Sequence, residues 1–300
     1  MAKQEQAQPF RSVVLATDFS PAVRVAGRYA ALLAQHYDAE LVVVHAFTLQ
    51  QSALAAEELG HVRSMQREHL ERLLSETVRE LAPFALKAES VLGQGSPIDV
   101  IDRVSKQHAP ALIVLGTHGG GATERHVIGS VAEEILRTIH SPVLTVGPHV
   151  AMPSADKVAF RRILYATDFC VASALAAAYA FVLAQAFGSD IDVLHVASEG
   201  GIGEDKRLAE REKEFLDALS EVIPQHVEAF RSRTFVEFGK VRERVVKHAH
   251  ERGVDLIVLG AHHHSHLARH LRTGPAFHII LEAACPVLTV CVPEQSVRQQ

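Results

Sequence analysis

The feature that most constrains this 300-residue chain is an internal repeat. The segment Val14–Phe19 recurs as Leu164–Phe169, and both copies contain Ala-Thr-Asp-Phe. Two more pairs of segments repeat in the same order: Ala111–Gly116 with Asp255–Gly260, and Ser141–Val146 with Cys285–Val290. Because collinear matches of this kind indicate duplication, we expect two copies of one fold.

The boundary between the copies is expected in Gly147–Ala159, where Pro148, Pro153 and Ser154 interrupt any regular pattern. We therefore predict domains at residues 1–150 and 151–300. A domain of roughly 150 residues buries about 68–70% of its unfolded surface, so neither copy needs a disulfide to be stable.

Short apolar segments alternate with longer amphipathic ones in the first copy, which is typical of strands and helices. The expected strands are Val13–Thr17, Leu41–Ala46, Lys87–Leu92, Leu112–Gly116 and Val143–Val146. The expected helices are about Pro21–Tyr37, Ala55–Leu81, Ile98–Gln107 and Ser130–Thr138. Five buried strands that alternate with helices predict an α/β fold with a doubly wound parallel sheet in each copy.

Composition excludes several classes of protein. The 30 basic and 35 acidic residues give a formal net charge of −5, which is unlike a nucleic-acid binder. No apolar run approaches the roughly 20 residues of a membrane span, and the polar segment Met1–Pro9 is unlike a secretory signal. The chain has three cysteines, and an odd number argues against a framework of disulfides. We therefore expect reduced cysteines and a cytoplasmic protein.

A group of glycines follows the expected strand Leu112–Gly116, at the edge of the sheet where doubly wound folds bind ligands. Gly119 lies in the next turn, and Gly129-Ser130 opens the following helix. Glycine lets backbone N–H groups approach a phosphate, and a helix N-terminus supplies further donors. The structural alternatives are turn glycines and a plain N-cap serine. The combined spacing favours phosphate binding.

The pattern Gly116-x2-Gly119-x9-Gly129-Ser130 resembles the nucleotide-binding signature of the ATP-binding branch of the universal stress protein family. Ala16–Ser20 resembles the first-strand motif of that family, and Ser141–Val146 resembles its closing strand. The resemblance covers nearly the whole chain. It implies a tandem protein of two flavodoxin-like (Rossmann-like) units, each with strand order 3-2-1-4-5.

The resemblance implies that the first copy binds ATP, with Mg²⁺ as the accompanying ion. The implied contacts are Ala16, Thr17 and Asp18 at the nucleoside, Ala46 at adenine, Gly116 near the ribose, and Gly119, Gly129, Ser130 and Val131 at the phosphates. Family members often have proline where this chain has Ala16. Without the resemblance, Asp18 alone is equally explained as a cap of the following helix.

The second copy departs from this pattern. His263 stands where Gly119 stands, and Thr273 stands where Gly129 stands. Pro275 replaces Val131 and removes a backbone donor. We therefore predict one ATP site in the first copy and a degenerate site in the second.

Catalytic motifs are missing from the sequence, because it contains no P-loop, nucleophile elbow or kinase signature. The charged candidates near the first site are His118, Glu124, Arg125 and His126, and side chains of this kind in a loop are usually solvated. We assign no catalytic residue. One alternative is an enzyme that slowly hydrolyses ATP or transfers a group from it. The other is a metal-binding interaction protein that uses the histidine-rich loop of the second copy and has a vestigial nucleotide pocket.

Histidine is abundant, with 19 residues, and five of them lie between His262 and His270. If this segment is extended, His262, His264 and His266 share one face and provide enough ligands for Zn²⁺. The competing interpretation is an exposed polar loop. For His45 and His195, which end matching strands, we predict structural hydrogen bonds.

The expected role is ligand-gated signalling, in which bound ATP alters a surface that an unidentified protein partner reads. The closing strands Val143–Val146 and Val287–Val290 are predicted to pair within the chain as a pseudo-dimer, which would cover two strand edges. Whether whole chains form a homodimer is left open by the sequence.

Overall fold

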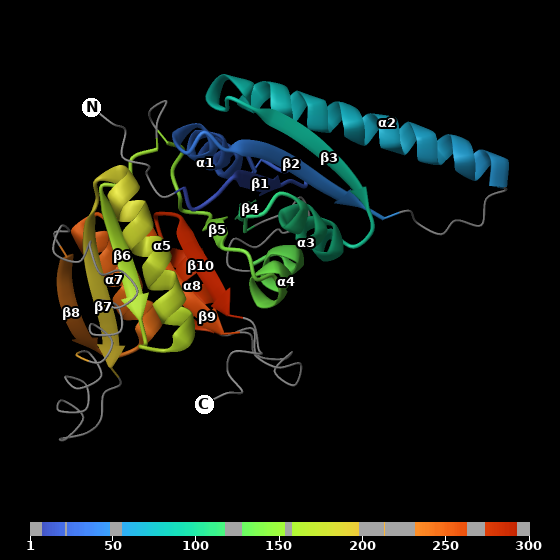
Figure 1. Ribbon diagram of the computed structural model, residues 1–300. Helices are drawn as coiled ribbons and strands as arrows, with labels where there is room; N and C mark the ends of the chain where they lie inside the picture. Colours follow the sequence, from blue (N-terminus) through green and yellow to red (C-terminus); the bar gives the residue numbers. More distant parts are fainter. Residues whose placement is uncertain are drawn as a thin grey trace, which may run out of the picture. The chain divides into compact units, whose positions relative to one another are not determined.

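The computed structural model describes residues 8–21, 23–48, 56–117, 128–153, 158–197, 213, 232–262 and 274–292. The chain forms two compact units, coloured along the sequence in Figure 1. One unit contains Phe10–Ile135 with Met152–Val158, and the other contains Leu136–Ala151 with the chain from Ala159 onward. In the described part of the chain, no helix combines the length and apolar character that a membrane span requires.

Four parallel strands form the sheet of the first unit. Their spatial order is β3 (Ala88–Gln94), β2 (Glu40–Phe47), β1 (Ser12–Ala16) and β4 (Ala111–Gly116). One face carries α1 (Val23–His36) and α2 (Ala56–Leu81), and the other carries α3 (Pro97–Gln107), as Figure 1 shows. Because helices cover both faces, the apolar residues 13–15 of β1 and 41–44 of β2 are almost fully buried.

Local sequence explains where these elements begin and end. The Ser96 hydroxyl accepts a hydrogen bond from the Asp99 amide at 3.3 Å, and Pro97 occupies the first turn of α3, where it removes no needed donor.

The expected strand at Lys87–Leu92 was placed slightly too early, because β3 pairs with β2 as far as Gln94.

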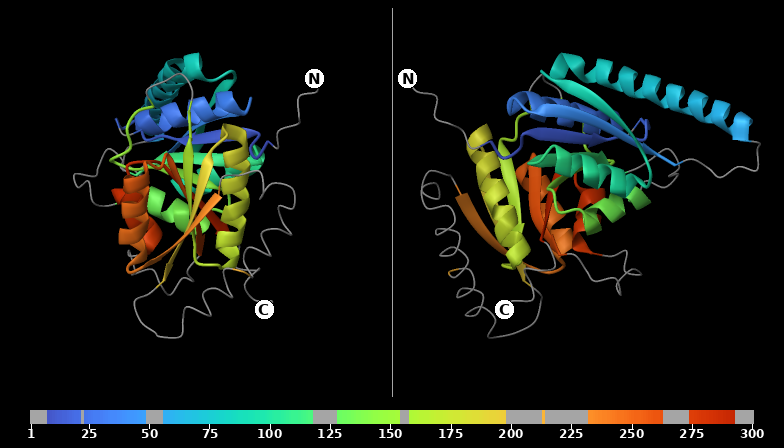
Figure 2. Two further views of the ribbon diagram at one scale, coloured as in Figure 1. Left: turned by 90° about the vertical axis from the view of Figure 1, so that its left-hand side faces the viewer. Right: turned by 45° about the vertical axis from the view of Figure 1, so that its right-hand side comes forward.

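The second unit contains a complete parallel sheet from the second repeat. Its order is β10 (Val287–Val292), β9 (Leu256–His262), β6 (Arg162–Thr167), β7 (Asp190–Ala197) and β8 (Ser232–Phe238). Figure 2 shows α5 (Val171–Phe187) on one face and α7 (Val241–Arg252) with α8 (Pro275–Glu282) on the other. The predicted α/β class is confirmed, and the order 3-2-1-4-5 is complete in this repeat.

The closing strand of the first repeat, β5 (Val143–Val146), belongs to this second unit. It pairs antiparallel with β10, and Leu144 lies opposite Leu288. These two leucines occupy equivalent positions in the two repeats, and Val143 and Thr145 lie opposite Thr289 and Val287 in the same reciprocal way. The predicted pairing of the two closing strands within one chain is confirmed.

A buried charge network distinguishes the core of the second repeat. Asp192 is only 1% exposed and accepts a hydrogen bond from Arg252 Nε at 2.5 Å. The His248 ring lies between two carboxylates, with Nδ1 2.8 Å from Glu237 Oε1 and Nε2 3.6 Å from Asp192 Oδ2. The first repeat has Val42 where the second has Asp192, so the two cores have diverged in polarity.

Candidate functional site

The turn after β1 is fixed by two side chains. Thr17 Oγ1 accepts a hydrogen bond from the Phe19 amide at 3.0 Å, and Asp18 Oδ1 accepts one from the Ser20 amide, also at 3.0 Å. Phe19 has a φ of 63°, a left-handed conformation that is uncommon for a residue with a large side chain. Asp18 therefore caps its own turn and precedes the start of α1, while most of its side chain faces solvent.

His45 ties this turn to the next strand. Its Nδ1 lies 2.7 Å from the Thr17 carbonyl oxygen, so Nδ1 carries the proton and donates. The ring also packs on Phe19, with 4.4 Å between centroids and 37° between planes. The predicted structural role of His45 agrees with these contacts, which hold the ends of β1 and β2 together.

A backbone hydrogen bond connects the end of β4 with the start of the next helix. Thr117 is 2% exposed, and its carbonyl accepts a hydrogen bond from the Gly129 amide at 2.8 Å. This bond joins the residue after β4 to the residue that precedes α4 (Ser130–Thr138). The Gly129 carbonyl in turn accepts from the Glu133 amide at 2.9 Å, so Gly129 takes the N-cap position and Ser130 is the first helical residue.

The predicted nucleotide residues lie on few elements. Ala16 ends β1 and is followed by Thr17 and Asp18, Ala46 lies near the end of β2, and Gly116 ends β4. Because these strands are parallel, their carboxyl ends share one edge of the sheet. Ser130 and Val131 begin α4, where the Val131 side chain is 37% exposed. Gly119 and the four charged candidates of its loop lie outside the described residues.

The same turn recurs after β6. The Phe169 amide donates to Thr167 Oγ1 at 3.0 Å, and His195 Nδ1 lies 2.9 Å from the Thr167 carbonyl oxygen. Asp168 differs from Asp18, because its Oδ1 accepts a hydrogen bond from the Ser173 hydroxyl at 2.5 Å as well as one from the Cys170 amide at 3.1 Å. The second repeat thus keeps the scaffold of the turn but engages its carboxylate with α5.

Gly260, the equivalent of Gly116, has a structural explanation. A Cβ atom at this position would overlap the backbone of Ala172 and Ser173, at the start of α5. Only glycine therefore lets α5 pack against β9, whether or not a ligand binds. This glycine alone is no sign of a phosphate site.

A pocket of about 240 Å³ opens beside this turn in the second unit. The ends of β6, β7 and β9 line it, together with α7, the first turn of α8, and the last part of α4. Its polar side chains include Arg137, Thr167, Asp168 and Thr289, and the remaining wall is mostly apolar. Sequence reasoning missed the contribution of α4, because that helix belongs to the other repeat.

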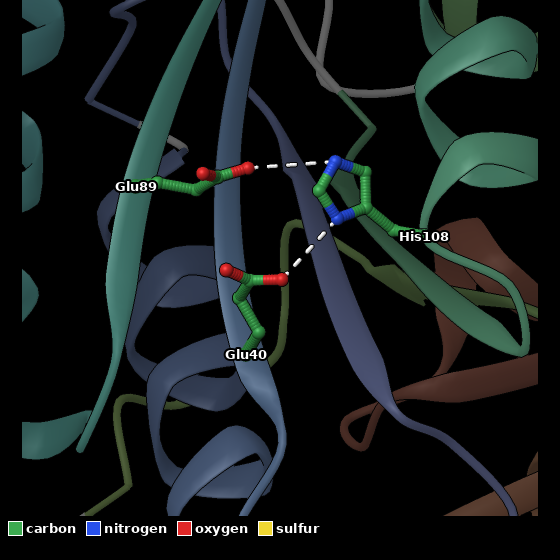
Figure 3. A group of neighbouring side chains, drawn as sticks. All are labelled: Glu40, Glu89 and His108. Atoms are coloured by element: carbon green, nitrogen blue, oxygen red, sulfur yellow. Dashed lines mark hydrogen bonds and ion pairs between the residues drawn. The ribbon is translucent and has the colours of Figure 1, made fainter.

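The predicted zinc ligands are only partly described. His262 is the last residue of β9, whereas His264 and His266 lie outside the described residues. Within the described chain, another group has metal-ligating atoms within 4.8 Å of one another: Glu40, Glu89 and His108. Figure 3 shows both carboxylates directed at the two ring nitrogens, with Nδ1 3.3 Å from Glu40 Oε2 and Nε2 3.4 Å from Glu89 Oε1.

This group lies at the amino ends of β2 and β3 and just before β4, away from the glycine-rich edge. The Ser12 hydroxyl donates to the His108 carbonyl at 2.7 Å and fixes the backbone of that residue. A neutral imidazole has only one N–H, so it cannot donate to both carboxylates, whereas an imidazolium or a bound cation satisfies both. This group could not be predicted from the sequence, because its three residues lie on separate elements and have no characteristic spacing.

The three cysteine thiols have low reactivity because they are wholly or partly buried. Burial raises the pKa of both the Cys285 and the Cys291 thiols to about 12, and burial also raises the pKa of Cys170. Cys291 Sγ donates to the Leu136 carbonyl at 3.4 Å. Thiols of this kind are poor nucleophiles and poor metal ligands at neutral pH.

Comparison with known proteins agrees with the fold and the repeat. Residues 9–147 and 159–290 each match the model of the Universal stress protein family. A universal stress protein of Methanocaldococcus jannaschii is 27% identical over 139 residues, which are 46% of this chain and 82% of that protein. One from Mycobacterium tuberculosis is 27% identical over 199 residues, 64% of this chain and 65% of that protein.

Among solved structures, a universal stress protein from Archaeoglobus fulgidus aligns over 96% of this chain and 98% of its own, with a TM-score of 0.73 and 20% identity. At that identity the likeness concerns the fold. Together with the two matched stretches, it means that this chain belongs to the universal stress protein family and carries two copies of its domain.

Proposed function

We propose that the first repeat, residues 1–150, binds ATP with Mg²⁺, and that the chain acts as a nucleotide-dependent signalling module of the stress response. The main support is the hydrogen bond from the Gly129 amide to the Thr117 carbonyl. It joins the residue after β4 to the residue before α4, and the N-terminus of a helix supplies backbone amides that suit phosphate.

The residues present fit a nucleotide. Ala16, Ala46 and Gly116 have small or no side chains, which leaves the backbone accessible at three strand ends. The Ser130 side chain is exposed at the start of α4, and the Asp18 side chain is exposed in the turn after β1. Bound ATP would supply the charge that gates a surface for a partner protein. A cytoplasmic location belongs to this proposal.

The direct test is calorimetric titration of the full chain with Mg²⁺-ATP. Gly119→Val should lower the affinity at least tenfold, because a side chain would stand where backbone must approach phosphate. The matched control is His263→Val, which alters the equivalent position of the second repeat and should leave the affinity unchanged. Equal affinities of wild type and Gly119→Val would refute the phosphate-loop assignment.

Stoichiometry tests the predicted difference between the repeats. Equilibrium dialysis should give one ATP per chain, and two equivalent sites would contradict a degenerate second repeat, residues 151–300. The alternative function, slow ATP hydrolysis or group transfer, predicts turnover that disappears in Asp18→Ala. Absence of turnover together with ATP binding supports the signalling role.

A further inference from the structure

The pocket of the second repeat differs chemically from a nucleotide site. Its wall consists largely of aliphatic side chains from β7, β9, α7 and α8: Leu194, Val241, Val245, Leu259, Ile279 and Ile280. Most of these side chains are buried, so the wall is part of the hydrophobic core. A volume of about 240 Å³ with such a lining suits an apolar ring system or a short hydrocarbon chain.

The end of the pocket that would face phosphates has fewer hydrogen-bond donors than its counterpart in the first repeat. Gly274 stands where the first repeat has Ser130, so the hydroxyl is gone, and Pro275 has no backbone N–H. The Phe277 amide is also engaged, because it donates to the Gly274 carbonyl at 3.2 Å. The start of α8 therefore offers a phosphate chain fewer donors than a helix N-terminus ordinarily does.

Charge at the pocket is sparse and mixed. Arg137 lies over the Phe277 ring, with 5.1 Å from its guanidinium carbon to the ring centroid, and Asp168 supplies a carboxylate. One cation and one anion give no net attraction for the several charges of a triphosphate. They leave room for a ligand with at most one polar head group.

A buried hydroxyl points to a bound molecule. Thr289 lines the pocket and is 1% exposed, yet within the described residues its Oγ1 has no hydrogen-bond partner. Buried polar atoms in proteins are nearly always paired. A polar atom of a ligand in the pocket would complete this hydrogen bond.

We propose that the second repeat binds a small, largely apolar and phosphate-free molecule, anchored through one polar group at Thr289. The site would therefore complement the proposed ATP site of the first repeat. The replacement of Ser130 and Val131 by Gly274 and Pro275 would then reflect a different class of ligand in the second repeat, where an apolar pocket is present.

The test uses the neutral aromatic probe N-phenyl-1-naphthylamine, whose fluorescence rises in apolar surroundings, titrated into the full chain. Val241→Trp should fill the rim of the pocket and weaken binding at least tenfold. Val236→Trp is the matched control, because both valines are similarly exposed, at 39% and 38%, but only Val241 lines the pocket. The control should bind the probe like wild type, and melting curves should establish that both variants are folded.

Binding to Val241→Trp with unchanged affinity would overturn the proposal, as would displacement of the probe by ATP in a Gly119→Val background. Thr289→Val, which keeps the shape and removes the hydroxyl, should retain the probe but weaken ligands that carry a hydrogen-bonding group, such as naphthol. If the chain binds the probe but no ATP, only the function proposed for the first repeat fails.

Discussion

His45 donates a hydrogen bond from Nδ1 to the carbonyl oxygen of Thr17, at 2.7 Å, and the same bond joins His195 to Thr167 at 2.9 Å. In both repeats, therefore, a histidine on the second strand forms a hydrogen bond with the turn after the first strand. This hydrogen bond offers a matched pair of variants, because only one copy adjoins the proposed ATP site.

His45→Phe keeps an aromatic ring against Phe19 but leaves the Thr17 carbonyl without its donor. We expect a loss of about 1 kcal/mol in the free energy of unfolding and roughly tenfold weaker ATP binding, because the turn that carries Asp18 loses a constraint. Urea unfolding and calorimetry measure the two effects. His195→Phe should destabilise the chain similarly without changing ATP affinity, and an equal effect on ATP would place the nucleotide elsewhere.

Two glycines predict different responses to a single methyl group. A Cβ at Gly93 would overlap the methyl groups of Val100, whereas a Cβ at Gly260 would overlap the backbone of Ala172 and Ser173. We expect Gly93→Ala to cost about 1–3 kcal/mol, with part of the cost recovered in a Gly93→Ala, Val100→Ala double variant. Gly260→Ala should cost more, since backbone cannot yield as a side chain does. A smaller loss at Gly260 than at Gly93 would contradict this packing.

The group in Figure 3 predicts a metal response. Glu40 and Glu89 direct two carboxylates at the His108 ring, and one imidazole with two carboxylates is a ligand set that suits Zn²⁺. In a background with His262, His264 and His266 changed to alanine, Zn²⁺ should raise the melting temperature at pH 7.5. His108→Arg should abolish that rise while it preserves the fold, because Arg252 occupies the equivalent position in the second repeat. An unchanged zinc response in His108→Arg would exclude these residues.

The buried thiols predict a loss of stability in alkali. Cys285 and Cys291 have a pKa of about 12 in the folded chain, against roughly 8.5 for an exposed thiol. Because the folded state holds these protons more tightly, the stabilisation is complete below about pH 8.5 and is lost as the pH rises toward 12. Each thiol should contribute a slope of roughly 1 kcal/mol per pH unit.

Urea unfolding at pH 7.5 and pH 9.5 measures this slope, and a Cys285→Ala, Cys291→Ala variant should show a shallower one. Burial also raises the pKa of Tyr37 and Tyr165, so their contribution begins only above about pH 10. An identical pH dependence in the double variant would mean that the thiols ionise without a folding cost.

Sequence patterns predicted the parts of this fold that depend on local order. The long helix expected at Ala55–Leu81 is α2, Ala56–Leu81, because its amphipathic period continues unbroken to the proline at position 83. The pairing of β5 with β10 was predictable from the need to cover two apolar strand edges. The family resemblance depends on three short motifs together with the repeat, and each motif is local in the sequence.

What sequence reasoning missed depends on contacts between distant elements. The network of Asp192, His248 and Arg252 joins one strand to one helix across a gap of some sixty residues, and nothing in its local spacing indicates burial. The contribution of Arg137 to the pocket of the second repeat was likewise unpredictable. Arg137 belongs to the first repeat in sequence but to the second unit in the structure. The periodicity of a single repeat cannot predict a contact of this kind.

The reciprocal pairing of Leu144 with Leu288 has a consequence for how this chain evolved. In two separate subunits, strands paired in this way would part on dilution. Within one chain the partner strand is always present, at an effective concentration set by the linker alone. Selection for a tight match between the edges of β5 and β10 is therefore weaker than in a dimer of separate subunits. Each repeat can change its ligand while the other keeps the two repeats assembled.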